Sequence, residues 1–332
     1  MLTAPWRTGT TTLVLLAAIL GGSTLGALVS DAGAAVGDFV DPMIMLLVGC
    51  LFFTLSLDGL STLRRAPRTV LLALGINFIA VPLVACVLTA LVPNDALRLG
   101  VLIYCLAPCT DWFLGFTRLA GGDTRIGAAL IPVQMVLQLA LYPVWLGIFA
   151  DGTVAPAPAD VGDTLLTWFV LPAVAGLGLR LLLRAVAPKG WRGVVVATVD
   201  RAIALVIAAV IIGIFAANIA TILTDVGAFA WVLLVVFLFF VVTFVVGESV
   251  TNLVGLPYPE HALLTMTTSA RNAPLMLAVT AIALPDQPVV YAAIILGMLI
   301  EFPHLTALTH VLRRRAGRQY LDAAPAPAAA KT

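Results

Sequence analysis

The stretch that decides the fold is Tyr104-Cys-Leu-Ala-Pro-Cys-Thr-Asp-Trp112, which lies inside an apolar run long enough to cross a bilayer. Pro108 lacks a backbone donor and clashes with the preceding turn, at about 3 kcal/mol inside a helix, so we expect a kink or an unwound segment there. Asp111 follows within one turn, and a carboxylate near the middle of a span costs about 2.5 to 3.5 kcal/mol on insertion scales. Both residues argue against a plain membrane anchor and favour a span that faces protein or water.

A second stretch, Thr268-Ser-Ala-Arg-Asn-Ala-Pro274, again places an ionisable residue and a proline between apolar flanks. Two interrupted spans, one with the acid Asp111 and one with the base Arg271, are typical of the substrate site of a secondary transporter. The candidate substrate-binding residues are Cys109, Thr110, Asp111, Ser269, Arg271 and Asn272, with the helix breaks at Pro108 and Pro274.

The composition indicates a polytopic, all-α membrane protein. Of the 332 residues, 61% are hydrophobic and only 11% are charged, whereas a soluble protein of this length needs far more surface charge. The net charge of +1 gives no reason to expect a nucleic-acid partner. No Gly-x-Gly-Asp, Gly-x-Ser-x-Gly or His-Glu-x-x-His pattern is present, so we expect a transporter rather than an intramembrane enzyme, with no cofactor and no metal site.

Ten apolar stretches follow one another along the chain, and we expect each to form a transmembrane helix. They lie at 11–29, 42–57, 70–91, 99–116, 126–150, 165–183, 203–223, 229–250, 262–284 and 289–312. The first could be read as a signal peptide, but we expect it to be retained because its removal would spoil the even number of spans.

The charges between these stretches set the orientation. Nearly all Arg and Lys residues fall on the side of the N-terminus, with Arg98 outside and Arg271 deep in a span as exceptions. The positive-inside rule therefore predicts a multi-pass protein of the inner (plasma) membrane with both termini in the cytoplasm.

The ten spans divide into two sets of five. Residues 1–150 would form the first five-helix repeat, 151–312 the second, and 313–332 a cytoplasmic tail. An odd number of spans in each half inverts the second half relative to the first, and the two broken spans are then the fourth and the ninth. An inverted repeat predicts that Pro108 and Pro274 meet near the middle of the membrane.

Three motifs carry a resemblance to a known family. Leu106-Ala-Pro-Cys-Thr-Asp111, Thr117-Arg-Leu-Ala-Gly-Gly-Asp123 and Gly297-Met-Leu-Ile-Glu-Phe-Pro303 resemble the arsenite efflux permeases of the bile acid/sodium symporter superfamily. The resemblance implies two inverted five-helix repeats whose fourth and ninth helices are broken and cross. In that family a cysteine of the fourth span and a glutamate of the tenth are tied to arsenite transport, and these map to Cys109 and Glu301.

The sequence departs from the sodium-coupled members of that superfamily. Those members carry a Glu and a Gln around the break of the ninth span, where this sequence has Thr267 and Arg271. An Arg where a cation should bind argues against a sodium site. A sodium- or proton-coupled symporter of an organic anion, which would share the fold, stays open as the alternative function.

The favoured function is export of arsenite by proton antiport. Cys109 is either a small buried hydrophobe or a soft thiol ligand for trivalent arsenic, and Cys105 is a weaker candidate one turn earlier. Asp111 and Arg271 either pair for structural reasons or contact substrate. Glu301, whose sequence neighbours are apolar, is the expected proton carrier, because apolar surroundings favour the neutral form of an acid. The other ionisable residues in the late spans are expected to be structural: Glu248, His304 and His310.

The loop charges generate a topology prediction. Reporter fusions after Leu57 and Leu183 should read cytoplasmic, and fusions within 36–41 and 153–163 should read outside. A reporter that places residues 36–41 in the cytoplasm would overturn the ten-span model.

Overall fold

The computed structural model describes residues 8–55, 59–110, 112–149, 170–223, 226–285 and 287–322. Every regular element in these ranges is a helix, which confirms the expected all-α class. Within them, six helical segments are long and apolar enough to cross a membrane: Gly33–Thr54, Pro67–Thr89, Thr124–Trp145, Gly190–Ala220, Phe229–Val254 and Pro288–Ala316. The chain is therefore a multi-pass membrane protein.

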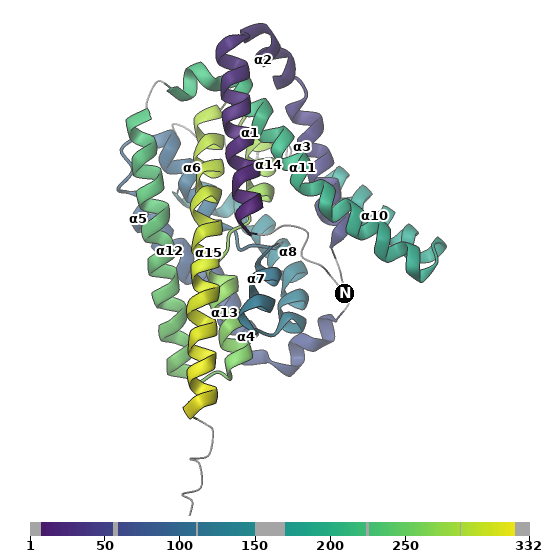
Figure 1. The fold of residues 1–332 in the computed structure, drawn as a ribbon, viewed down its shortest axis with the longest axis vertical. Coiled ribbons are helices and arrows are strands. Elements are labelled where there is room, and N and C mark those ends of the chain that lie inside the picture. The colour runs from purple at the N-terminus through teal and green to yellow at the C-terminus, as the bar shows by residue number, and fades with distance from the viewer. Residues whose placement is uncertain are drawn as a thin grey trace, which may run out of the picture.

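The helices form two groups that pack mainly within themselves (Figure 1). The first group is α1 (Thr8–Leu28), α2 (Ser30–Gly37), α3 (Val40–Thr54), α10 (Leu171–Val186) and α11 (Lys189–Ile222). The second is α4 (Pro67–Gly75), α5 (Val81–Thr89), α6 (Asp95–Leu106), α7 (Phe113–Ala120), α8 (Thr124–Phe149), α12 (Val226–Val254), α13 (Tyr258–Ser269) and α14 (Ala273–Ala283). The long α15 (Pro288–Asp322) packs against α6, α12 and α14 of the second group and against α1 and α11 of the first.

Glycines allow the first group to pack closely. A Cβ built on Gly26 of α1 would lie 2.1 Å from the carbonyl oxygen of Ala216 in α11, and one on Gly176 of α10 would lie 2.2 Å from the carbonyl oxygen of Gly49 in α3. Only glycine tolerates such distances, and small residues at helix crossings are the usual means by which membrane helices approach each other.

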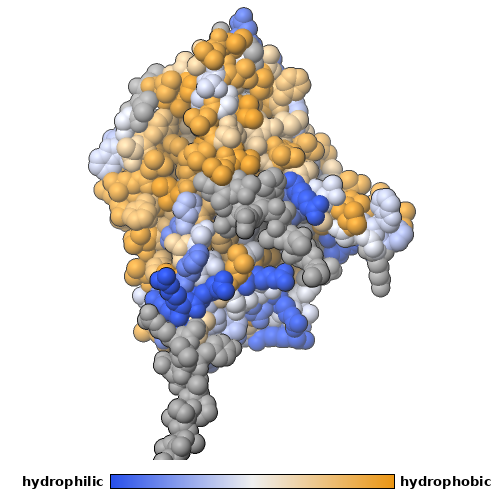
Figure 2. Space-filling view, in the orientation of Figure 1, coloured by the Kyte–Doolittle hydropathy of each residue, from blue (hydrophilic) through white to orange (hydrophobic). Residues whose placement is uncertain are grey.

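The outer surface is suited to lipid. Figure 2 shows hydrophobic residues over much of the visible face, with hydrophilic residues gathered towards its lower end. Large apolar side chains stand exposed on the helices, as Leu71, Val87 and Leu253 do at 70%, 71% and 86%. In water such a surface would aggregate, whereas in a bilayer it contacts acyl chains.

The third apolar stretch contains a feature that the sequence analysis missed. A π-helical turn, η2 (Ile76–Ala80), joins α4 to α5 just before Pro82. The proline ring clashes with the carbonyl four residues earlier, that of Phe78, and a local change to wider π geometry is one way to relieve such a clash. This turn buries Asn77 completely.

Several helix ends differ from the expected spans. α11 begins at Lys189 rather than at 203, and α15 continues through Arg313–Arg315 to Asp322, where a tail was expected. The hydropathy pattern stops at charged residues, but a helix continues beyond the apolar layer as long as its backbone stays bonded. The short η1 (Leu60–Arg65) and α2 also occupy expected loops. The sixth expected span starts within 150–169, which lies outside the described residues. The ten-span count and the inverted repeat therefore stay predictions.

Candidate functional site

The two interrupted helices cross at their breaks. α6 ends at Leu106 and α7 begins at Phe113, while α13 ends at Ser269 and α14 begins at Ala273. Pro108 and Arg271 form an isolated antiparallel bridge, in which the Cys109 amide donates to the Ala270 carbonyl and the Asn272 amide donates to the Ala107 carbonyl, each at 3.0 Å. Backbone groups released by one break are thus satisfied by the other, as a non-helical segment at membrane depth requires.

The bridge shows which backbone groups pair at the crossing. Pro108 pairs with Arg271, while Pro274 lies in the first turn of α14, so the expected meeting of Pro108 with Pro274 stays a prediction. A proline suits that position, where its missing N–H is not needed and its fixed φ already matches the helix.

Asn272 joins the two breaks through its side chain. Its Oδ1 accepts from the Leu275 amide at 3.3 Å, which caps α14, and its Nδ2 donates to the Thr110 hydroxyl at 2.8 Å. Both side chains are buried. Two of the predicted site residues, one from each interrupted stretch, are therefore in direct contact.

Glu301 of α15 is fully buried beside the crossing. Its Oε1 accepts from the Arg271 backbone amide and from the Trp112 indole Nε1, both at 2.9 Å, and its Oε2 accepts from the Tyr104 hydroxyl at 2.9 Å. The three donors come from the two interrupted stretches. The carboxyl of the tenth apolar stretch is thus held at the point where the fourth and ninth cross.

Arg271 has a fully buried side chain that is bound by uncharged oxygens. Its Nη1 donates to the Cys105 carbonyl at 3.1 Å, and its Nη2 donates to Asn77 Oδ1 at 3.1 Å, to the Thr268 carbonyl at 2.6 Å and to the Thr267 carbonyl at 3.4 Å. The guanidinium carbon also lies 5.6 Å from the centre of the Phe239 ring, a cation–π distance.

The structure places the predicted site residues as follows. Cys109, Thr110, Ser269, Arg271 and Asn272 are all buried at the crossing, and Glu301 contacts it. Asp111 lies outside the described residues, so its expected pairing with Arg271 stays a prediction. Cys105 is buried in the last turn of α6, where its backbone carbonyl accepts a hydrogen bond from Arg271.

Sequence reasoning missed five further residues of the site. Tyr104 and Trp112 hold Glu301, Asn77 and Phe239 contact the Arg271 guanidinium, and Gln134 of α8 donates to the Thr267 hydroxyl at 3.0 Å. The signal that could have found Asn77 and Gln134 is an amide inside an apolar span, because such a group needs a partner away from lipid.

Some polar atoms at the crossing have no hydrogen-bond partner among the described residues. They are the Ser269 hydroxyl, Arg271 Nε and Asn77 Nδ2, all on fully buried residues. Buried polar groups are normally satisfied, so unsatisfied ones of this kind fit a place where water or a ligand enters.

Outside the crossing, Glu248 and His304 contact residues of neighbouring helices. Glu248 of α12 binds His261 Nε2 at 2.7 Å and the Thr265 hydroxyl at 3.1 Å through Oε1, and it pairs with Arg315 through Oε2. His304 stacks on Phe240 with ring centres 4.6 Å apart. These contacts tie α13 and α15 to α12.

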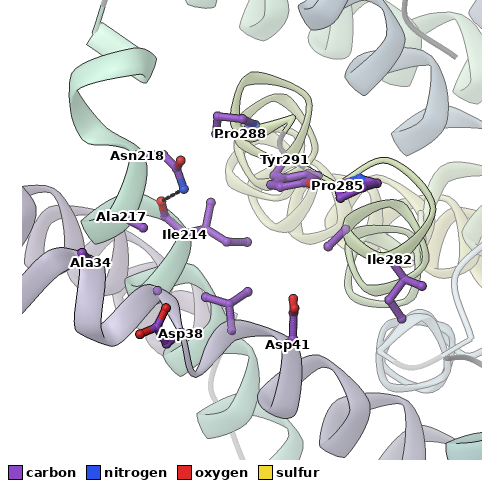
Figure 3. A pocket seen from close by; sticks show the side chains of 13 residues that line it. Ala34, Asp38, Asp41, Ile214, Ala217, Asn218, Ile282, Pro285, Pro288 and Tyr291 are labelled. Atoms are coloured by element: carbon purple, nitrogen blue, oxygen red, sulfur yellow. Dashed lines mark hydrogen bonds between the residues drawn. The ribbon is translucent and has the colours of Figure 1, made fainter. Parts of the chain in front are cut away.

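A cavity of about 580 Å³ lies away from the crossing, between α2, α3 and α11 on one side and α14 and α15 on the other (Figure 3). Asp38, Asp41, Asn218 and Tyr291 are among its lining residues. Asn218 donates to the carbonyl of Ile214 on its own helix at 3.0 Å (Figure 3). The cavity lies where the two groups of helices meet.

Comparison with known proteins agrees with the sequence resemblance. The model of the sodium bile acid symporter family matches residues 42–249, more than half of the chain. The Arsenical-resistance protein Acr3 of Corynebacterium glutamicum is 23% identical over 228 residues, which cover 65% of this chain and 61% of that protein. The chain therefore spans less than two thirds of the length of this relative.

The packing around Tyr104 generates a stability prediction. A Cβ on Gly297 would lie 2.8 Å from three atoms of the Tyr104 ring. Gly297→Ala should therefore destabilise the protein by about 1–3 kcal/mol through overpacking, seen as a lower midpoint of thermal unfolding in detergent. Gly115→Ala is the matched control, because a Cβ there meets no heavy atom within 4 Å. Equal midpoints for the two variants would contradict the packing described.

Proposed function

We propose that this chain, which belongs to the sodium bile acid symporter family and is therefore a membrane transporter rather than an enzyme, exports arsenite in exchange for protons. The observation that carries the proposal is the position of Glu301, whose buried carboxyl accepts hydrogen bonds from both interrupted helices. A proton taken up there changes the contacts of the same segments that carry the candidate substrate ligands. The named relative and the resemblance of the Cys109 and Glu301 motifs favour arsenite as the substrate.

The proposed ligand for arsenic is the Cys109 thiol. Trivalent arsenic is thiophilic, and soft thiolates select soft centres. Cys109 is fully buried in the unwound segment, whose backbone is pinned to Ala270. Hydroxyl groups of arsenous acid would find hydrogen-bonding partners in Thr110, Ser269 and Asn272, and the Ser269 hydroxyl has none among the described residues.

The coupling follows from the charge of the substrate. Arsenous acid is neutral at physiological pH, so its export against a gradient requires a second species that moves the other way. Glu301 is the proposed carrier of that species, a proton. Arg271 cannot take this role because a guanidinium stays protonated in proteins.

Tyr104 gives Glu301 a means of binding a proton without losing a hydrogen bond. The Tyr104 hydroxyl lies 2.9 Å from Glu301 Oε2 and 3.1 Å from the Gly297 carbonyl. When Glu301 is ionised, the hydroxyl donates to Oε2. When Oε2 is protonated, the carboxyl donates to the hydroxyl, and the hydroxyl turns to donate to Gly297. Both protonation states are then satisfied inside the apolar core.

The proposed membrane arrangement has ten crossings in two inverted five-helix repeats, residues 1–150 and 151–312, with both termini in the cytoplasm. α6 and α7 would form the fourth crossing, and α13 and α14 the ninth. The cavity beside Asp38 and Asp41 would then open to the outside, and Glu248 with its partners His261 and Arg315 would lie towards the cytoplasm. The cavity lies at one end of the boundary between the two helix groups, and this boundary is the proposed path of the substrate to the crossing.

A symporter of an organic anion is the second candidate, and Arg271 is the observation that favours it. A buried guanidinium whose Nε has no hydrogen-bond partner among the described residues suits a carboxylate or another oxyanion. An uptake assay in everted vesicles distinguishes the arsenite exporter from the organic-anion symporter. Radiolabelled arsenite and a radiolabelled bile acid are each tested with a pH gradient, a sodium gradient or neither. The proposal requires arsenite uptake with the pH gradient alone.

The thiol mechanism predicts a selective cysteine effect. Cys109→Ser should reduce arsenite resistance of a sensitive host to about the level of the empty vector, because serine is a poor ligand for arsenic. Cys50→Ser and Cys86→Ser are matched controls at half-buried cysteines away from the crossing and should leave resistance unchanged. Immunoblots of membranes would check that all three variants are present. Full resistance in Cys109→Ser would remove the thiol mechanism.

The coupling mechanism predicts a separation of binding from transport. Glu301→Gln keeps the shape of the side chain but cannot exchange a proton, so uptake driven by a pH gradient in everted vesicles should stop. Arsenite should still protect Cys109 from a thiol reagent in that variant. Normal uptake by Glu301→Gln under a proton gradient would refute the assignment of Glu301.

A further inference from the structure

The Arg271 guanidinium is bound by oxygens of the chemical kind that also binds hard cations. Four acceptors lie 2.6 to 3.4 Å from its two terminal nitrogens: the carbonyls of Cys105, Thr267 and Thr268, and Oδ1 of Asn77. All four are uncharged and all four residues are fully buried. Carbonyl and amide oxygens are the ligands that hard cations prefer.

The three carbonyls are available because the helices are interrupted. In a continuous helix the Cys105, Thr267 and Thr268 carbonyls would accept from the amides of residues 109, 271 and 272. Those amides donate elsewhere, to Ala270, to Glu301 and to Ala107 respectively. The last turns of α6 and α13 therefore direct released carbonyls, and the negative ends of two helix dipoles, at one point. Such half-helix ends are where transporters coordinate sodium.

The fourth oxygen comes from the π-helical turn. Asn77 lies in η2, and its Oδ1 accepts from the same Nη2 that the Thr268 carbonyl binds. This set of acceptors, the carbonyls of Cys105, Thr267 and Thr268 with Asn77 Oδ1, is called the oxygen cage below. It is contributed by three separate segments, so it is a built site rather than the end of a single helix.

We propose that the Arg271 guanidinium is a tethered cation that fills the oxygen cage and takes the place of a sodium ion. The residues at this point do not fit sodium while Arg271 is present, although the family is named for sodium symport. The proposal rests on the proposed function in one respect, that the coupling ion is a proton. It goes further by assigning the exclusion of sodium to one side chain and by predicting that a cation site remains when that side chain is removed.

A tethered cation also explains why Arg271 and Glu301 would have different roles, one with a fixed charge and one with a charge that changes. Arg271 remains protonated and attached to the backbone, so it supplies the positive charge at the crossing in every state of the transport cycle. A bound sodium ion would leave with each cycle. Glu301, which binds the Arg271 amide rather than its guanidinium, is then the group whose charge can change.

The test is a cation-binding measurement on the purified, full-length protein in detergent. Thermal unfolding of the wild type and of Arg271→Ala is compared in sodium chloride, in guanidinium chloride at millimolar concentration and in choline chloride of equal ionic strength. The wild type should show the same midpoint in all three. Arg271→Ala should be stabilised by sodium or by guanidinium, by about 3 °C or more near saturation, because a ligand that binds only the folded state raises the midpoint.

Two controls tie that response to the oxygen cage. Arg271→Ala combined with Asn77→Ala should lose the response, because one ligand is gone. Arg98→Ala should not gain the response. Arg98 lies away from the crossing, and its Nη1 is 3.2 Å from Asp95 Oδ1. Arsenite takes no part in the assay, so failure of the substrate assignment does not affect its outcome.

Three results would overturn the inference. One is a sodium-dependent stabilisation of the wild type. Another is an Arg271→Ala variant that folds but responds to neither ion. The last is an Arg271→Ala variant that fails to fold in all three salts. If the oxygen cage accepts a free cation, sodium or guanidinium should restore folding of this variant.

Discussion

The structure of the site depends on the backbone pairing between the two interrupted helices. Two hydrogen bonds, from Cys109 to Ala270 and from Asn272 to Ala107, replace helical bonds that Pro108 and the second break remove. In the bilayer core an unpaired backbone group costs several kcal/mol, so the two breaks stabilise each other. The remaining released groups are then left to bind side chains: one amide holds Glu301, and the carbonyls hold the Arg271 guanidinium.

Two opposite charges are stabilised separately at this crossing. Among the described residues, Arg271 binds neutral acceptors and the Phe239 ring, and Glu301 binds the neutral donors Tyr104, Trp112 and a backbone amide. Burying a charge without partners is prohibitive, and a direct salt bridge would hold both groups ionised. Under the proposed mechanism, separate solvation would keep the positive charge fixed and leave the carboxyl able to exchange its proton. Because the donors to Glu301 belong to both interrupted stretches, a change in its protonation would, under the proposed mechanism, act on the segments that carry Cys109 and Thr110.

The sequence was sufficient for the features that depend on local chemistry and insufficient for those that depend on distant contacts. A proline and an ionisable residue in an apolar run located both interruptions, and the Gly297–Pro303 motif located Glu301. The partners of Glu301, Tyr104 and Trp112, lie 197 and 189 residues away in the chain, and no local pattern joins them. The π-helical turn that buries Asn77 was missed because apolar periodicity cannot distinguish it from an ordinary helix. The pairing of Pro108 with Arg271 was not foreseen, because symmetry of position does not fix which backbone groups pair.

The most direct test of the account is arsenite-evoked proton movement in proteoliposomes that contain only this protein. With a pH-sensitive dye inside and no sodium present, arsenite added outside wild-type vesicles should enter in exchange for protons, so the lumen should become more alkaline. Glu301→Gln vesicles should show no change. A pH response of equal size in Glu301→Gln, or a wild type that moves arsenite only when sodium is added, would contradict a mechanism in which Glu301 carries the proton and Arg271 replaces the sodium ion.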